Sequence, residues 1–215
     1  MRTFTINDFY FLLDGALWTI WLSLASLACG GILGALICAM RLSRFRALRL
    51  TAGAIVQVGQ GVPPLVQIFL AYFGLAALGL ELPPFLAAAI ALSFFAAVYL
   101  GEIWRSAVQA IPQQQWEAAE SLALTRTQQM TCVIAPQALR FATPPTIGLI
   151  VQLVKNTSLA SIVGMVELTR SGQLVNNATF ESFKIFGLIC VIYFCICFPI
   201  SRLSRLLENR MRVAR

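Results

Sequence analysis

Long runs of this chain carry no charged residue. The clearest covers residues 17–40, and a helix of about 20 apolar residues is enough to cross the hydrocarbon layer of a bilayer. A cleavable signal peptide would have a shorter apolar core preceded by positive charge, whereas Asp8 and Asp14 precede this run. Since 59% of the residues are hydrophobic and only 12% are charged, the sequence predicts an integral membrane protein.

Four further apolar runs suit membrane spans. They are residues 51–80, 85–101, 145–166 and 185–200. Prolines and glycines interrupt the first half of residues 51–80, so we expect that span to begin near Pro63 and Pro64. The sequence therefore predicts an all-α polytopic membrane protein with five transmembrane helices, in which residues 1–215 form a single transmembrane domain.

The basic residues between the runs indicate the direction of insertion. Loops rich in Lys and Arg stay in the cytoplasm. One side of the membrane receives Arg41, Arg44, Arg46, Arg49, Arg105, Arg126, Arg140, Arg202, Arg205, Arg210, Arg212 and Arg215. The other side receives only Arg2, Arg170 and Lys184. We therefore expect the N-terminus outside and the C-terminus in the cytoplasm, and we attribute the net charge of +7 to membrane anchoring and not to nucleic-acid binding.

Small residues within the apolar runs indicate packing and not chemistry. The six cysteines show no spacing typical of metal ligands, and the chain has no histidine. We therefore expect neither a disulfide nor a metal site. Gly30 and Gly34 form a small-xxx-small pair beside Gly31, which predicts the close approach of another helix.

A polar loop at about residues 106–142 separates the third and fourth runs. Pro112 is suited to open a helix, residues 115–124 read as helical, and Pro136 interrupts the next segment. A helix lying along the membrane surface would present Glu117, Ala118 and Ala119 to the cytoplasm, where small side chains beside a carboxylate suit a protein groove. The alternative is an ordinary solvated loop, which would not need the apolar residues of this segment.

The same loop resembles the EAA loop of ABC-importer permeases. The matching residues are Glu117-Ala118-Ala119, then Leu122-Ala123, then "IAPQA" at 134–138. Ala123 stands where the family usually has glycine, and Ala135 where it usually has leucine. The resemblance implies a coupling helix that sits in a cleft of the ATPase subunit. Glycine at this position often ends the helix with a positive φ, so Ala123 there would cost about 1 kcal/mol.

Further segments are similar to the polar amino acid uptake branch of that family. They are "GVPPLVQIFLAYFGL", "YLGEIWRSAVQAIPQQQWEAA" and "LVKNTSLASIVGMVELTR". The resemblance implies an inner-membrane permease subunit with a second permease, identical or homologous, two ATPase subunits and an extracytoplasmic solute-binding protein. The chain has no GxxxxGK[ST] phosphate loop. We therefore expect it to be no enzyme and to bind no cofactor, with ATP and Mg²⁺ on the partner ATPase.

The fourth run holds an unusual cation, Lys155. An ionisable group in the membrane almost always faces protein or water. Helical spacing puts Gln152, Lys155 and Asn156 on one face, with Thr157 and Ser158 beside them. We expect these residues to bind a zwitterionic amino acid, although the Thr157 hydroxyl could equally bond its own backbone. The family often has aspartate in place of Asn156, which favours a neutral or acidic amino acid over a basic one.

Two charged pairs lie at the ends of the predicted spans. Glu102 with Arg105, and Glu167 with Arg170, have either a gating role or a structural one. The binding protein is expected to dock near the second pair.

Two rival functions compete with the importer. One is an ion-coupled secondary transporter, although the chain shows no internal inverted repeat; the other is a non-transporting scaffold, which would not need Lys155.

Overall fold

The computed structural model describes residues 2–213, with side chains described as far as residue 206. Every regular element in this part of the chain is helical, which confirms the all-α prediction. The elements are α1 (Ile6–Leu42), α2 (Arg46–Gly61), α3 (Pro64–Phe69), η1 (Leu70–Gly74), α4 (Leu75–Ala77), α5 (Pro84–Gln109), α6 (Gln113–Ser121), α7 (Arg126–Gln128), η2 (Gln129–Ile134), α8 (Ala135–Asn156), η3 (Thr157–Val163), α9 (Leu168–Thr179) and α10 (Ser182–Val213).

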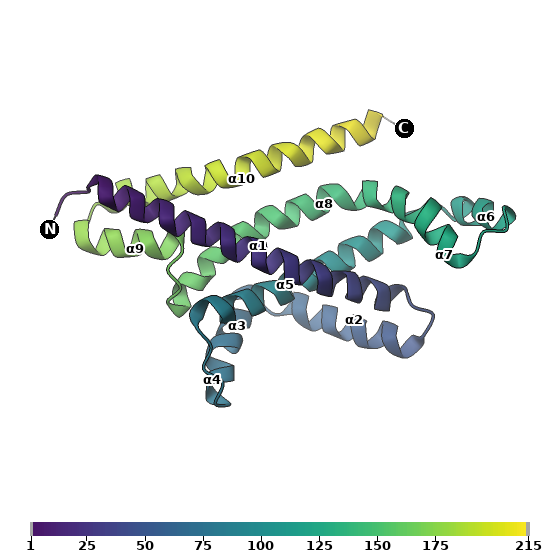
Figure 1. Cartoon of the computed structure of the whole chain (residues 1–215), viewed down its shortest axis with the longest axis horizontal. Helices are drawn as coiled ribbons and strands as arrows, with labels where there is room; N and C mark the ends of the chain where they lie inside the picture. The colour runs from purple at the N-terminus through teal and green to yellow at the C-terminus, as the bar shows by residue number, and fades with distance from the viewer. Residues whose placement is uncertain (1, 214–215) are drawn as a thin grey trace.

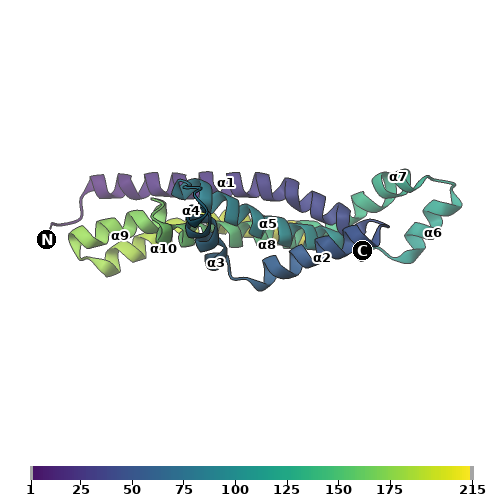
Figure 2. The ribbon, with the colours of Figure 1, turned by 90° about the horizontal axis from the view of Figure 1, so that it is seen from below.

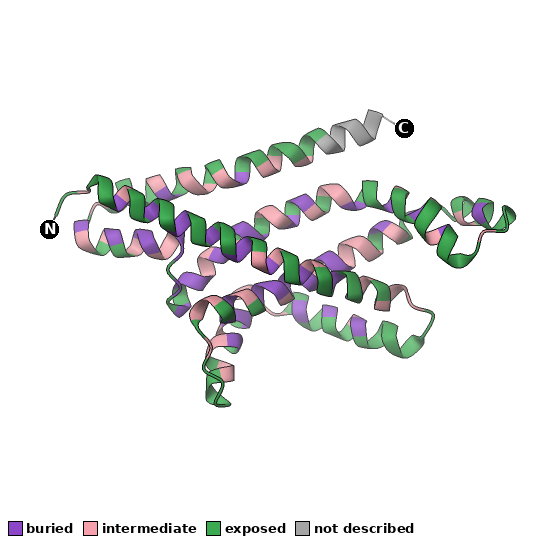
Figure 3. Cartoon of the chain, viewed as in Figure 1, coloured by how far each residue is buried: buried purple, intermediate pink, exposed green. Residues whose placement is uncertain are grey.

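The molecule is elongated, and its two ends carry different elements. The N-terminus, α9 and the start of α10 lie at one end, whereas the α1–α2 turn, α6, α7 and the C-terminus lie toward the other (Figures 1 and 2). Helix α5 is central, because it packs against α1, α2, α3 and α8. Its Leu92 and Phe95 form the main core with Leu22 of α1. Much of the outer surface of α1 and α10 is exposed (Figure 3), as expected of helices that face lipid.

Glycines set the close contact between α1 and α5. A Cβ atom at Gly30 would lie 2.5 Å from Ala96 Cβ, and one at Gly34 would lie 3.0 Å from Leu100 Cβ. Only a residue without a side chain fits at this distance. The predicted small-residue contact is therefore confirmed, with α5 as the partner helix.

Four helical segments of the described chain are long and apolar enough to cross a membrane, and a bent pair makes up to five. The pair is Arg46–Gly61 with Pro64–Ala77, bent by 103°. We expected the second span to begin near the prolines. A helix does begin there, since α3 starts at Pro64, but α2 precedes it and the chain turns sharply between the two. Buried Gln67 holds the bend, since its Nε2 donates to the carbonyls of Gly59 (2.8 Å) and Val62 (2.9 Å) at the end of α2.

Helix α8 also begins earlier than its apolar run. The run starts at residue 145, but the helix starts at Ala135 and continues through Pro144 and Pro145. At its other end the chain tightens into the 3₁₀ turn η3, which ends at Gly164 with φ +88°. Lys155 therefore lies one residue before the end of α8 and not in the middle of a continuous α-helix.

The polar loop folds into the short helices α6 and α7 with η2. Helix α6 packs against η2, and Trp116 joins a small core made by Ile111, Ile134 and Ala138. The helix predicted at residues 115–124 is thus present, but it covers Gln113–Ser121.

Candidate functional site

Two of the three residues expected on the exposed surface of α6 lie there, and the third, Ala119, does not. Glu117 and Ala118 are exposed, as predicted, but Ala119 is only 2% exposed. Ala119 lies three residues after Trp116, so the two share the inner face of the helix. The expectation that Ala119 faces the cytoplasm was therefore wrong. It supports the position of α6, while Glu117 and Ala118 form the surface available to a partner.

The end of α6 is built around Ala123. The N–H of Ala123 donates to Glu120 O at 2.9 Å, and the N–H of Leu124 donates to Ala119 O at 3.3 Å. This pair of bonds is the Schellman motif, which needs a left-handed residue after the helix. Ala123 has φ +54°, so an alanine occupies the conformation that the family usually gives to glycine.

A stripe of exposed residues runs along α8. We call this stripe the α8 face, and it consists of Phe141, Pro145, Gly148, Gln152 and Lys155. Their spacing of three or four residues places them on one side of the helix. The predicted alignment of Gln152 with Lys155 is present, and Asn156 lies half-buried beside them.

The other two predicted site residues lie differently. Thr157 is fully buried, and its hydroxyl donates to Val154 O at 2.8 Å. It therefore points into the protein, as the backbone alternative allowed, and is not on the α8 face. Ser158 is half-buried, and its hydroxyl donates to Lys155 O at 2.7 Å. The oxygen of Ser158 keeps its capacity to accept a hydrogen bond.

Asn156 has an unused donor. Its Nδ2 is shielded from solvent and has no hydrogen-bond partner among the described residues. A buried polar group without a partner carries a free-energy cost.

Glu167 lies inside the protein at the start of α9. It is completely buried, and its carboxylate accepts from the backbone N–H groups of Thr169 (3.0 Å) and Arg170 (2.8 Å). Tyr193 of α10 donates to Oε2 at 2.9 Å, and Thr19 of α1 lies 3.5 Å from the same atom. The carboxylate caps α9 and joins three helices, an arrangement that suits the structural alternative.

The environment of Glu167 also changes its ionisation. Burial raises the pKa of the carboxyl group above its ordinary value, although its backbone and Tyr193 hydrogen bonds act in the opposite direction. The Arg170 guanidinium does not pair with this carboxylate; it donates to Gln173 at 3.2 Å. Sequence spacing suggested an ion pair, but the glutamate bonds the Arg170 backbone instead.

Glu102 and Arg105 form the predicted pair one helical turn apart. Arg105 Nε donates to Glu102 Oε1 at 2.8 Å. A third member was missed from the sequence: Arg41 of α1, whose Nε lies 3.5 Å from Glu102 Oε2. That contact crosses from α1 to α5, and only the fold brings the two residues together.

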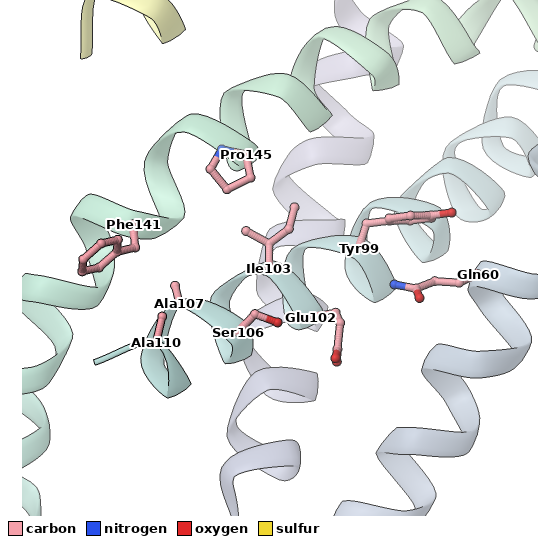
Figure 4. Close-up of a pocket in the computed structure, with 9 residues that line it drawn as sticks. All are labelled: Gln60, Tyr99, Glu102, Ile103, Ser106, Ala107, Ala110, Phe141 and Pro145. Carbon is pink, nitrogen blue, oxygen red and sulfur yellow. The ribbon is translucent and has the colours of Figure 1, made fainter. Parts of the chain in front are cut away.

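A cavity of about 370 Å³ lies beside this cluster (Figure 4). We call it the inner cavity. Its polar lining comes from Gln60 of α2 and from Tyr99, Glu102 and Ser106 of α5, and its apolar lining includes Phe141 and Pro145 of α8. The last two residues also belong to the α8 face, so the inner cavity and the α8 face are continuous.

Known proteins share both the sequence and the fold. Residues 31–213 match the family described as binding-protein-dependent transport system inner membrane component. The L-cystine transport system permease protein TcyB of Bacillus subtilis is 33% identical, over 95% of this chain and 88% of that protein. The glutamine transport system permease protein GlnP of Escherichia coli K12 is 34% identical, over 94% of this chain and 93% of that protein.

Solved structures agree. A chain from the crystal structure of an amino acid ABC transporter with histidines is 31% identical, with a TM-score of 0.90 over 95% of this chain and 96% of that one. A chain of the inward-facing MetNI methionine ABC transporter is 20% identical, with a TM-score of 0.74 over 95% and 99%, and shares the fold. The chain therefore belongs to the family of binding-protein-dependent transport system inner membrane components: it is a multi-pass permease subunit of an ABC importer, a transport component and not an enzyme.

Proposed function

We propose that this permease subunit imports a polar amino acid, and that Lys155 holds the cargo's carboxylate. The observation that carries the proposal is the α8 face, where a lysine and an amide are exposed on an otherwise apolar membrane protein. An ammonium group in the bilayer core costs at least ~2.5 kcal/mol, so Lys155 has to face water or another subunit. The names of TcyB, GlnP and the amino acid transporter structure support this class of cargo.

The groups around Lys155 suit the two ends of a zwitterion. The ammonium of Lys155 donates, which fits a carboxylate, and the unbonded Nδ2 of Asn156 adds a second donor once its side chain turns toward the α8 face. The Ser158 oxygen can accept from the cargo's ammonium. Since Asn156 adds no negative charge, we infer a neutral or acidic polar amino acid in preference to a basic one. Thr157 would act only indirectly, by fixing the end of α8.

The partners follow from the same proposal. We infer a complex with a second permease subunit, identical or homologous, opposite the α8 face, and an extracytoplasmic binding protein. Two ATPase subunits carry ATP and Mg²⁺, and the exposed Glu117 and Ala118 of α6 enter a groove on one of them. The left-handed turn at Ala123 fixes the end of that helix. ATP drives transport only if it favours one arrangement of the permease over the other.

The direction of insertion is part of this proposal. The arginine-rich α1–α2 turn and α6 lie at the same end of the molecule (Figure 1). The positive-inside rule puts that end in the cytoplasm and the N-terminus outside. The binding protein then docks at the end that carries α9, where Arg170 lies half-buried.

Solute-stimulated ATP hydrolysis by the reconstituted complex tests the proposal. Lys155→Met should abolish stimulation by the cargo while leaving assembly intact. Lys184→Met is the matched control. Lys184 is the only other lysine, and it pairs with Glu181 near the start of α10. Unchanged stimulation at the same solute concentration in Lys155→Met would contradict the assignment. Uptake without any ATPase partner would favour the ion-coupled carrier.

A further inference from the structure

The inner cavity lies on the route that cargo would follow after leaving Lys155. The α8 face runs from Lys155 through Gln152 and Gly148 to Pro145. At 1.5 Å per residue, Lys155 and Pro145 are about 15 Å apart along the helix. Pro145 already lines the inner cavity, which lies toward the end of the molecule that carries α6. A solute moving toward that end therefore passes the cavity.

The lining suits a small amphiphilic molecule. Tyr99, Ser106 and the Gln60 amide offer hydrogen bonds, while Ile103 and Pro145 provide apolar contact (Figure 4). A few placed polar groups in a mainly apolar wall are typical of small-molecule sites. The volume of about 370 Å³ exceeds what a single water molecule needs.

Glu102 supplies the charge that the first site lacks. Arg105 occupies its Oε1. Its Oε2 is shielded and has no hydrogen-bond partner among the described side chains, since Arg41 Nε stays 3.5 Å away. The Arg41 Nε is likewise without a hydrogen bond in that part of the chain. Arg41 and Glu102 form an ion pair across the two helices but no hydrogen bond, so Oε2 remains an acceptor for a better-placed donor.

We propose that the inner cavity is a second, weaker station for the transported amino acid, in which Glu102 accepts the cargo's ammonium group in place of Arg41. This inference depends on the proposed function. The two stations hold opposite ends of the zwitterion: Lys155 takes the carboxylate, and Glu102 takes the ammonium. Cargo that has lost its contact with Lys155 thus regains a charged partner in Glu102. As the cargo binds there, the Arg41–Glu102 ion pair between α1 and α5 breaks. A transport path needs binding that is weak enough to permit release.

Equilibrium binding of radiolabelled glutamine to the nucleotide-free complex tests this inference. The wild type should show a tight and a weak class of site per permease subunit. Glu102→Gln should weaken only the weak class, on the order of tenfold, because one charged hydrogen bond is lost. Glu102→Asp should retain part of that affinity. Glu181→Gln is the matched control, since Glu181 also pairs with a basic residue one turn away.

A ligand analogue separates a binding role from a structural one. The compound 4-carbamoylbutanoate keeps the carboxylate and the amide of glutamine but has a hydrogen in place of the ammonium. It should still compete at the tight class, where the ammonium meets only the neutral Ser158 oxygen, and lose far more affinity at the weak class, where the ammonium meets charged Glu102. An unchanged weak class in Glu102→Gln, or equal competition at both classes, would overturn the second station. Survival of the tight class in Lys155→Met would overturn the proposed function alone, because the Glu102 result is read from the weak class.

Discussion

Gly30 gives a quantitative test of the contact between α1 and α5. A Cβ atom there would lie 2.5 Å from Ala96 Cβ and 2.8 Å from Ser93 O, whereas carbon atoms in contact sit about 3.5–4.0 Å apart. Gly30→Ala must therefore push the helices apart by about 1 Å, and overpacking of this kind costs roughly 1–3 kcal/mol. Gly31 is a matched control, because a Cβ at Gly31 meets nothing within 4 Å.

Thermal unfolding of the purified protein in detergent measures this difference. At about 2–4 °C per kcal/mol, Gly30→Ala should lower the midpoint by roughly 2–12 °C. Gly31→Ala should leave it unchanged or raise it, since alanine favours a helix over glycine by about 1 kcal/mol. Equal midpoints for the two variants would show that α1 and α5 do not pack as described.

The remaining predictions concern α6 and α9. Glu117→Lys should reduce co-purification of the ATPase subunit without unfolding the permease, because Glu117 is exposed; equal loss in Glu120→Lys, on the flank of the helix, would point to a general charge effect. Ala123→Gly should relieve a left-handed strain of about 1 kcal/mol and strengthen ATPase binding or stability; a weaker complex would contradict this. Burial favours protonated Glu167, so its contribution to stability should fall as pH rises from the ordinary pKa of 4.5 through the raised folded value. Glu167→Gln should remove that part of the pH dependence, and an unchanged pH profile of the unfolding midpoint would exclude it.

Much of the fold was predictable because the membrane restricts the choices. Uncharged runs predict helices, and Gly30 with Gly34 predicts a close helix contact. The bend after α2 was only half predictable. Pro63 and Pro64 predict an interruption, but its direction depends on Gln67, which bonds the end of α2, and on the fit of Gly59 against Phe94 and Val98.

The candidate site shows a similar limit. A uniform α-helical period placed Gln152 and Lys155 on one face correctly. The same period places Thr157 about 200° away from Lys155, so its burial on the other side of the helix follows from the spacing and is not an effect of the 3₁₀ turn. Arg41 and Tyr193 were missed because each meets its glutamate only through helix packing. One amino-acid sequence alone does not show which residues from distant helices will come into contact.

The most direct measurement is a structure of the complex with an amino acid bound in the membrane. We predict that the carboxylate of the cargo lies within about 3 Å of Lys155 Nζ, in a space between the α8 face and the second permease. A bound cargo that makes no contact with Lys155, with the lysine directed into lipid, would contradict the account.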